Sequence, residues 1–207
     1  MTAILLSGKE INAIFKKSIT DYHGTDDVDT SKPTPYPDGS FAALLYHKNW
    51  IDTVQWHLED LIRATDIDAQ TLVALKRRID ASNQLRTDKV EEIDDVFIAA
   101  FANIKTQPDA RLNSETIGWL LDRISILQLK VYHMTEQTHR NDAAPEHIAR
   151  CQAKLDILLE QEQDMIQCYD ELLAEIQAGT RRFKVYRQMK MYNDTDLNPV
   201  LYKALEK

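Results

Sequence analysis

The sequence predicts an all-α fold: an antiparallel up-down bundle of four long helices, with a short N-terminal helix and a basic C-terminal extension. Its 207 residues include only 5 Gly and 6 Pro, so long stretches contain no helix breaker. In these stretches apolar residues recur at helical spacing, and the short loops between them favour antiparallel neighbours. A chain of this length can bury one sizeable core, so we expect a single domain over residues 1–207.

A short helix is predicted near the N-terminus. Ser7 and Glu10 have the spacing of a capping box. Apolar residues then follow at helical spacing, namely Ile11, Ile14, Phe15 and Ile19. Residues 23–39 combine turn formers with three prolines and predict a loop, whose aspartates lack the alternating spacing of a calcium site.

Four long helices are predicted next, at about residues 40–65, 69–104, 113–140 and 145–178. Turn-forming residues separate them, and Pro145 is acceptable at the start of the last helix. The segment 113–140 is apolar on two sides, which predicts that it is the most central helix.

Polar residues interrupt the apolar stripes of these helices. The stripes contain five of them, His47, Asn83, Arg86, Gln128 and Glu162. A guanidinium in a core needs acceptors, because an unpaired ion in a low dielectric costs several kcal/mol, and Glu162 is the first candidate partner of Arg86. The five residues predict a polar layer inside the bundle, which either fixes the helix register or forms a ligand-binding or catalytic pocket.

The opposite side of segment 40–65 carries a second set of candidates. Asn49, Asp52, Glu59 and Arg63 share this side and by themselves predict a solvated face. Trp56 lies in the same stripe, and an exposed tryptophan beside polar groups is typical of a covered or binding surface. We expect either the chain itself, through the first helix or the C-terminal extension, or a partner or ligand to cover it.

The C-terminal extension, residues 180–207, differs in charge from the rest of the chain. It carries seven Lys/Arg against three Asp/Glu, although the net charge of the whole chain is −8. Arg187 and Lys190 belong to a run in which basic and aromatic residues alternate, a pattern that can bind phosphate and stack a ring. The alternative is that the segment docks on the acidic body of the bundle. The acidic net charge argues against nucleic-acid binding.

Signatures of common enzymes and metal sites are missing from the sequence. It has no Gly-rich phosphate loop, no nucleophile elbow and no Cys-x-x-Cys pair. The one Glu-x-x-His motif, Glu136 to His139, falls at a helix end, so we expect no metal or cofactor and interpret His133 and His139 as ordinary surface or packing histidines. Cys151 and Cys168 lie too far apart on one helix to bridge, which indicates a reducing cytoplasm. No stretch approaches a membrane span.

Several short motifs resemble a bacterial family of helical proteins catalogued only as a domain of unknown function, family 4254. The resemblance extends from about residue 40 to the end and rests on Asn49-Trp50-Ile51-Asp52, Gln55-Trp56-His57, Glu59-Asp60, Asn83-Gln84 with Arg86, Lys190-Met191-Tyr192-Asn193-Asp194 and Leu197-Asn198-Pro199. It implies no activity, substrate or catalytic residues. Such proteins tend to be encoded beside glycosyltransferases, which implies an accessory role in surface-glycan metabolism or a sugar-phosphate ligand.

Two functions are consistent with these observations. The first is a non-catalytic or accessory binding protein, which holds a protein partner or an anionic small molecule at the Trp56 face and the basic extension. The alternative is an enzyme acting on a phosphorylated sugar or nucleotide, with His47 and Glu162 as acid and base and with Arg86, Arg187 and Lys190 stabilising charge. The sequence leaves the ligand and the oligomeric state open.

Overall fold

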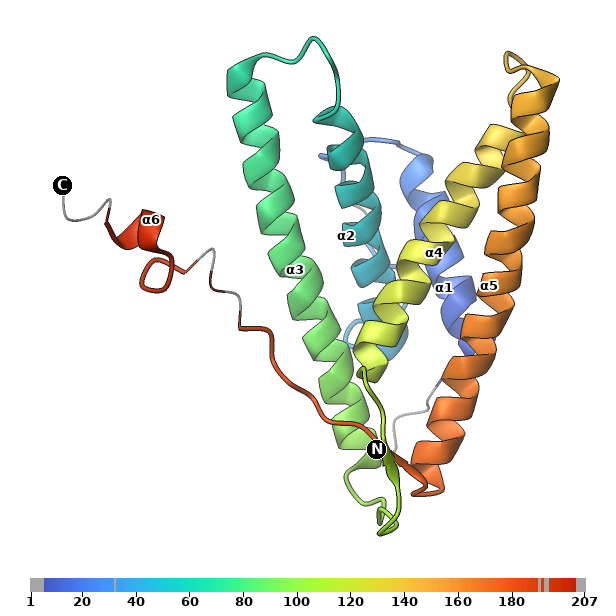
Figure 1. Ribbon diagram of the computed structural model, residues 1–207, viewed down its shortest axis with the longest axis vertical. Coiled ribbons are helices and arrows are strands. Elements are labelled where there is room, and N and C mark those ends of the chain that lie inside the picture. The colour runs from blue at the N-terminus through green and yellow to red at the C-terminus, as the bar shows by residue number, and fades with distance from the viewer. Residues whose placement is uncertain (1–5, 32, 190, 192–193, 204–207) are drawn as a thin grey trace.

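The computed structural model describes residues 6–31, 33–189, 191 and 194–203, and within them the fold is the predicted all-α helical bundle (Figure 1). Five helices form the body, and a short sixth helix follows in the C-terminal extension. The helices are α1 (Gly8–His23), α2 (Phe41–Leu61), α3 (Ala69–Phe101), α4 (Ile117–Thr138), α5 (Pro145–Gln177) and α6 (Pro199–Tyr202).

Local sequence signals set where the helices begin. The side chain of Ser7 accepts a hydrogen bond from the backbone N–H of Glu10, and the Glu10 carboxylate accepts one from the N–H of Ser7, so the predicted capping box is present. Side-chain oxygens also cap α2, α3 and α4, and they belong to Ser40, Asp68 and Thr116. Pro145 starts α5, where its missing N–H leaves no hydrogen bond unmade.

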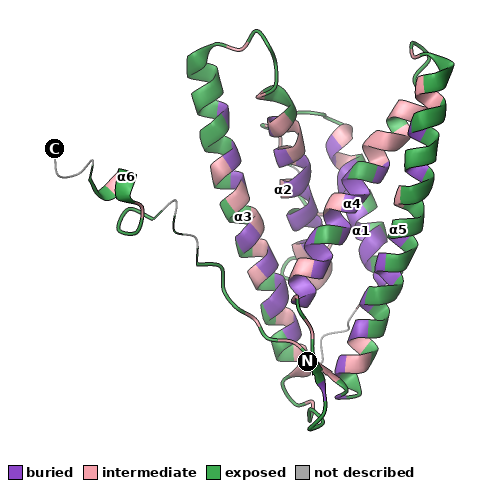
Figure 2. Ribbon diagram, viewed as in Figure 1, coloured by how far each residue is buried: buried purple, intermediate pink, exposed green. Residues whose placement is uncertain are grey.

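Helix α4 is the central helix, as its two apolar sides predict. It packs against α1, α2, α3 and α5. Residues on both sides are fully buried, for example Leu121 and Leu129. Buried residues run along α4 in Figure 2, whereas α5 has long exposed stretches. Any polar side chain on α4 that faces its neighbours is therefore withdrawn from water.

Gly118 brings the start of α4 close to α3. A Cβ atom here would lie 2.6 Å from the backbone oxygen of Val90 and 2.8 Å from a carboxylate oxygen of Asp94, so only glycine fits. The backbone N–H of Gly118 donates to that Asp94 carboxylate at 2.7 Å. This contact fixes the position of Asp122, one turn further along α4, opposite α3.

The side of α2 that faces the core differs from the prediction. His47, expected at the centre of the buried side, is exposed. Lys48, Asn49 and Asp52, on or beside the side expected to be solvated, are at most 1% exposed. The reason is that α2 contacts α1, α3 and α4, so most of its circumference is covered and His47 lies on the narrow side left outside.

The first residues of the basic extension pack along the edge of the bundle. Gly179, with a φ of 74°, ends α5 in the left-handed region that glycine favours. Strand β2 (Arg181–Arg182) then pairs in parallel with β1 (Arg111–Leu112), a small ladder that the sequence does not predict. Phe183 packs against the core, while α6 lies away from the other helices in Figure 1.

A candidate binding pocket beside a buried charge cluster

Four charged side chains meet between α2, α3 and α4, and we call them the charge cluster: Lys48, Asp52, Arg86 and Asp122. Arg86 Nε donates to Asp52 Oδ1 at 2.8 Å, and Arg86 Nη2 donates to Asp122 Oδ1 at 2.9 Å. Lys48 Nζ forms ion pairs with both carboxylates, 2.7 Å from Asp122 Oδ1. Only Arg86 keeps appreciable contact with solvent, its side chain being 22% exposed. Two positive and two negative charges therefore neutralise one another inside the bundle.

The ionisation of the cluster follows from these contacts. Burial alone would raise the pKa of Asp122, but the charges of Lys48 and Arg86 outweigh it and hold that pKa below its ordinary value. Burial works against the charge on Arg86, yet Asp52 and Asp122 raise its pKa. Ser125 donates a hydrogen bond to Asp52, and Asn49 Nδ2 donates to Ser125 Oγ at 2.8 Å. Asp122 and Arg86 are thus held charged, and all four groups of the cluster are hydrogen-bonded or ion-paired.

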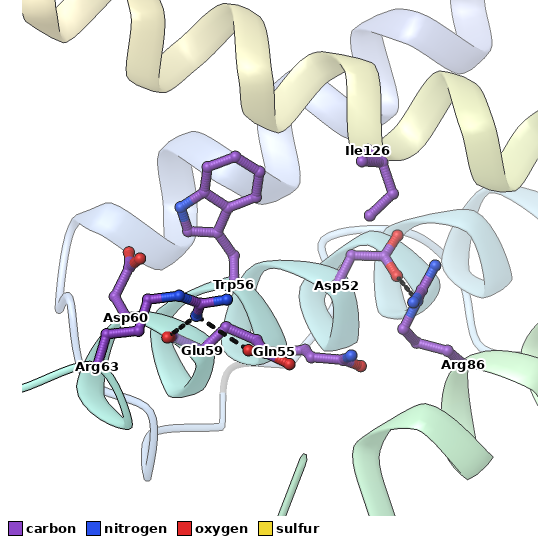
Figure 3. A pocket seen from close by; sticks show the side chains of 8 residues that line it. All are labelled: Asp52, Gln55, Trp56, Glu59, Asp60, Arg63, Arg86 and Ile126. Atoms are coloured by element: carbon purple, nitrogen blue, oxygen red, sulfur yellow. Dashed lines mark hydrogen bonds and ion pairs between the residues drawn. The ribbon is translucent and has the colours of Figure 1, made fainter. Parts of the chain in front are cut away.

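An open pocket of about 250 Å³ lies at the exposed edge of this cluster, and we call it the Trp56 pocket (Figure 3). Its lining consists of Asp52, Gln55, Trp56, Glu59, Asp60, Arg63, Arg86 and Ile126. Arg63 Nη1 donates to Glu59 Oε2 at 2.9 Å. The indole, the carboxylates of Glu59 and Asp60 and two guanidinium groups are therefore available to one small molecule, whereas the Asp52 side chain is 0% exposed.

The structure brings together five of the predicted site residues. Asp52, Trp56, Glu59, Arg63 and Arg86 all line the Trp56 pocket. Trp56 is half-buried and stacks on the ring of His133, with ring centroids 5.0 Å apart, so α4, which was not among the elements expected to cover it, covers part of its surface.

The expected single polar layer is not present. Arg86 binds Asp52 and Asp122, so the predicted partnership with Glu162 is wrong. Glu162 is 4% exposed, and its Oε1 atom accepts from Asn12 Nδ2 and from Lys16 Nζ, both at 2.7 Å, on α1. Sequence periodicity places these groups on core-facing stripes, but it cannot show which helices those stripes face.

The remaining predicted site residues that the structure describes lie outside the Trp56 pocket lining. Asn83 accepts a hydrogen bond from Gln55 Nε2 at 2.8 Å. Arg187 forms ion pairs with Glu91 at 3.2 Å and with Asp95 at 2.5 Å on the exposed surface of α3. Docking of the basic segment on the acidic body is therefore present at this position. Lys190 lies outside the described residues.

Sequence reasoning missed a cluster of three histidines, His23, His57 and His133, which come from α1, α2 and α4. One ring nitrogen of each lies within 4.8 Å of the other two. Burial, with a further contribution from the two neighbouring imidazoles, lowers the pKa of His57 and favours its neutral form. No local motif signals this cluster, because its members are far apart in sequence and only the packing of three helices brings them together.

These features define a helical-bundle protein with a self-neutralised charge cluster and an open, mixed-charge pocket at its edge. The model of the family described as "Protein of unknown function (DUF4254)" matches residues 42–185, and the chain belongs to this family. No curated protein and no solved structure matches the chain. Within the described residues, the structure contains no helix with the length and apolar character needed to cross a membrane.

Proposed function

We propose that the protein is a non-catalytic, accessory binding protein, and that the Trp56 pocket holds a sugar unit of a small, polar ligand. The observation that carries the proposal is the composition of the pocket, in which an indole lies among carboxylates and guanidinium groups. A sugar ring has an apolar face that packs on an aromatic side chain. Its hydroxyl groups donate to carboxylates and accept from arginine.

The charges of the pocket support a hydroxyl-rich ligand more than a highly charged anion. Arg63 is paired with Glu59, and Arg86 is paired with Asp52, so neither guanidinium is an isolated positive charge. Asp60 adds a further carboxylate to the lining. A phosphate on the sugar would have to compete with these carboxylates for the arginines, whereas a hydroxyl group can bridge an arginine and its carboxylate.

The contacts of His47 and Glu162 do not support an enzyme that uses this pair. His47 is exposed on α2, whereas Glu162 is buried and bound to Asn12 and Lys16 on α1. An accessory role in surface-glycan metabolism is consistent with the proposed sugar ligand. The free thiols of Cys151 and Cys168 support a cytoplasmic location, where such thiols stay reduced.

The test is a thermal-shift panel of neutral sugars, sugar phosphates and nucleotides on the full chain. A ligand at a hundred times its Kd should raise the Tm by about 5–10 °C. Trp56→Leu should abolish the shift, and Arg63→Gln should reduce it. Arg123→Gln is the matched control, since Arg123 also donates to a glutamate at 2.9 Å but on the exposed side of α4.

Two results would overturn the proposal. One is a shift of equal size in the wild type and in Trp56→Leu, which would place the ligand elsewhere. The other is the absence of any shift across the panel, which would favour a protein partner for the Trp56 face. The unliganded variants must retain the wild-type Tm within a few degrees for either comparison to count.

A further inference from the structure

The three-histidine cluster has the geometry of a metal site. His57 Nε2 and His23 Nε2 lie 3.2 Å apart. Two nitrogen ligands of one tetrahedral zinc ion, each bonded at about 2.0–2.1 Å, are about 3.3 Å apart. A ring nitrogen of the third imidazole, from His133, lies within 4.8 Å of the other two, so this ring would have to move closer to share one ion with them.

Hydrogen bonds already orient two of the rings for metal binding. His23 Nδ1 lies 2.7 Å from the carbonyl oxygen of Ile19, which can only accept, so this nitrogen carries the proton. His133 Nδ1 lies 2.7 Å from Glu136 Oε2 and donates to that carboxylate. In these tautomers both Nε2 atoms carry a lone pair, and that of His23 accepts a hydrogen bond from His57 Nε2 at 3.2 Å. Metal-binding histidines are held in this way, by a carbonyl or carboxylate behind the ring.

One of these lone pairs has no other use in the part of the chain that the structure describes. His133 Nε2 is buried and has no hydrogen-bond partner among the described residues. A buried polar atom without a hydrogen-bond partner destabilises the folded protein. A metal ion bound to His133 Nε2 would remove this cost and explain why the atom is placed here. The neighbouring aromatic rings, Tyr22 stacked on His57 and Tyr132 stacked on His23, restrict where the imidazoles can move.

We propose that His23, His57 and His133 bind one Zn²⁺ ion and that Asp26 supplies the fourth ligand. Asp26 Oδ1 lies 3.9 Å from His57 Nε2, farther than the separation of about 3.3 Å between two zinc ligands, but its side chain is 63% exposed and can move toward the ion. Asp26 has a φ of 50°, a conformation that Asp tolerates better than most residues and that lets the loop after α1 turn here. Neutral imidazoles with one carboxylate form a donor set that suits zinc.

The ion would tie together α1, α2 and α4 at one end of the bundle. His23 is the last residue of α1, His57 lies near the end of α2 and His133 lies in the last turns of α4. Its role is therefore to fix the mutual positions of three helices and of the loop that carries Asp26. This inference does not depend on a sugar in the Trp56 pocket, although His133 stacks on Trp56.

The main experiment measures zinc binding to the full chain after treatment with a chelator. Titration calorimetry and metal analysis should give one Zn²⁺ per chain, and Co²⁺ should give the strong visible absorption of a tetrahedral site. His57→Asn and His133→Asn should abolish stoichiometric binding. His47→Asn on α2 and His139→Asn at the end of α4 are matched controls, because both histidines are exposed, and these variants should bind as the wild type does.

Two milder variants keep the test decisive if the histidine variants fold poorly. Glu136→Gln removes the carboxylate behind His133 from an exposed position and should weaken zinc binding about 10–100-fold. Asp26→Asn should also weaken it, and an unchanged affinity would remove Asp26 from the ligand set. In the wild type, Zn²⁺ should protect His23, His57 and His133 from diethyl pyrocarbonate while His47 stays reactive.

The proposal is overturned if the chelator-treated wild type binds no stoichiometric zinc. It is also overturned if binding survives His57→Asn and His133→Asn but is lost in Cys151→Ser. That second result would assign the ion to the pair formed by Cys151 and His147, whose Sγ and Nε2 atoms lie 3.4 Å apart.

Discussion

The bundle contains two clusters of buried polar side chains, one around Asp52 and one around Glu162, and their atoms are hydrogen-bonded or ion-paired to different degrees. In the charge cluster, Lys48, Asp52 and Asp122 are almost fully buried, and each makes at least two ion pairs or hydrogen bonds. Around Glu162 the pairing is incomplete: Glu162 Oε2 and Asn12 Oδ1 have no hydrogen-bond partner among the described residues. The first group is therefore a fixed part of the core, whereas the second can exchange partners with water or a ligand.

The cluster around Glu162 is also the more solvent-exposed of the two. Lys16, the cation that binds Glu162, has a side chain that is 50% exposed, while that of Lys48 is 0% exposed. Lys16 and Gln128 both line a cavity of about 430 Å³ between α1 and α4. Solvent screening weakens an ion pair at such a site, so stability should depend on the charge cluster far more than on Glu162.

The largest effect is expected from Asp52→Asn. The substitution keeps the shape of the side chain but leaves Lys48 and Arg86 with one carboxylate between them, deep in the bundle. Removing one member of a buried ion-pair network costs about 3–5 kcal/mol, and urea unfolding followed by circular dichroism measures this loss.

Asp80→Asn is the matched control for that measurement. Lys76 and Asp80 have the same i,i+4 spacing as Lys48 and Asp52, but their side chains are 57% and 38% exposed. The control should lose less than about 1 kcal/mol. Losses of similar size in the two variants would contradict the difference in role that the structure assigns to the two pairs.

The next largest effect is expected from Asp122→Asn, which should lose stability to an extent that depends on pH. Because the pKa of Asp122 is lowered in the folded state, its stabilising contribution is complete above the unfolded value of 3.8 and is lost as the pH falls through the folded value. At neutral pH the variant should be less stable by about 1.5–3 kcal/mol, the worth of hydrogen bonds to charged groups.

Urea unfolding of both proteins at several pH values checks this. The difference in free energy of unfolding should be constant near neutral pH. It should shrink below about pH 4, where the carboxyl of the unfolded chain takes up a proton, and should vanish once the pH has fallen through the lowered folded-state pKa. A difference that stays constant at acid pH would mean that the charge on Asp122 contributes nothing.

The same contrast explains how far the sequence predicts this fold. Helix starts are encoded locally, at Ser7 with Glu10 and at Pro145, so the helices were predictable. The apolar stripes of α3 and α5 each run along one side, and Ile93 and Tyr169 on them are fully buried, although Leu72 and Leu159 on the same stripes are 41% and 40% exposed. Where one apolar side faces one core, periodicity identifies that side but not how far along the helix the core extends.

The prediction failed on α2 because partners in three-dimensional space decide burial there. Lys48 and Asp52 form an i,i+4 pair, which in the sequence is indistinguishable from a surface pair such as Lys76 and Asp80. Ion pairs with Arg86 on α3 and Asp122 on α4 offset the free-energy cost of burying Lys48 and Asp52, and these contacts are not visible in the sequence. The Trp56 pocket was predictable in part, since its α2 residues share one helix side. The neutralisation of Lys48 and Arg86 was not, because it depends on Asp122, which lies on α4.

A smaller loss is expected from Glu162→Gln. The amide can still accept a hydrogen bond from Asn12 at the place of Oε1, and Lys16 is exposed enough to be hydrated when its partner is neutral. The loss in urea unfolding should be about 1 kcal/mol, and a double-mutant cycle with Lys16→Met should give a coupling below that value. A loss as large as that of Asp52→Asn would place Glu162 among the fixed core charges.

The smallest effect is expected from Gln128→Met, and its sign should be opposite. Gln128 is 1% exposed, and neither atom of its amide has a hydrogen-bond partner within the described residues. Methionine has a similar shape and leaves no polar atom to satisfy, so the variant should be more stable by up to about 1 kcal/mol in urea unfolding. A loss of more than about 1 kcal/mol would show that the amide is hydrogen-bonded in solution, by water or by a ligand in the cavity between α1 and α4. In that case solvent or a ligand would satisfy the Gln128 amide in place of protein partners, and among these buried groups only Glu162 Oε2 and Asn12 Oδ1 would remain without a partner in the described part of the chain.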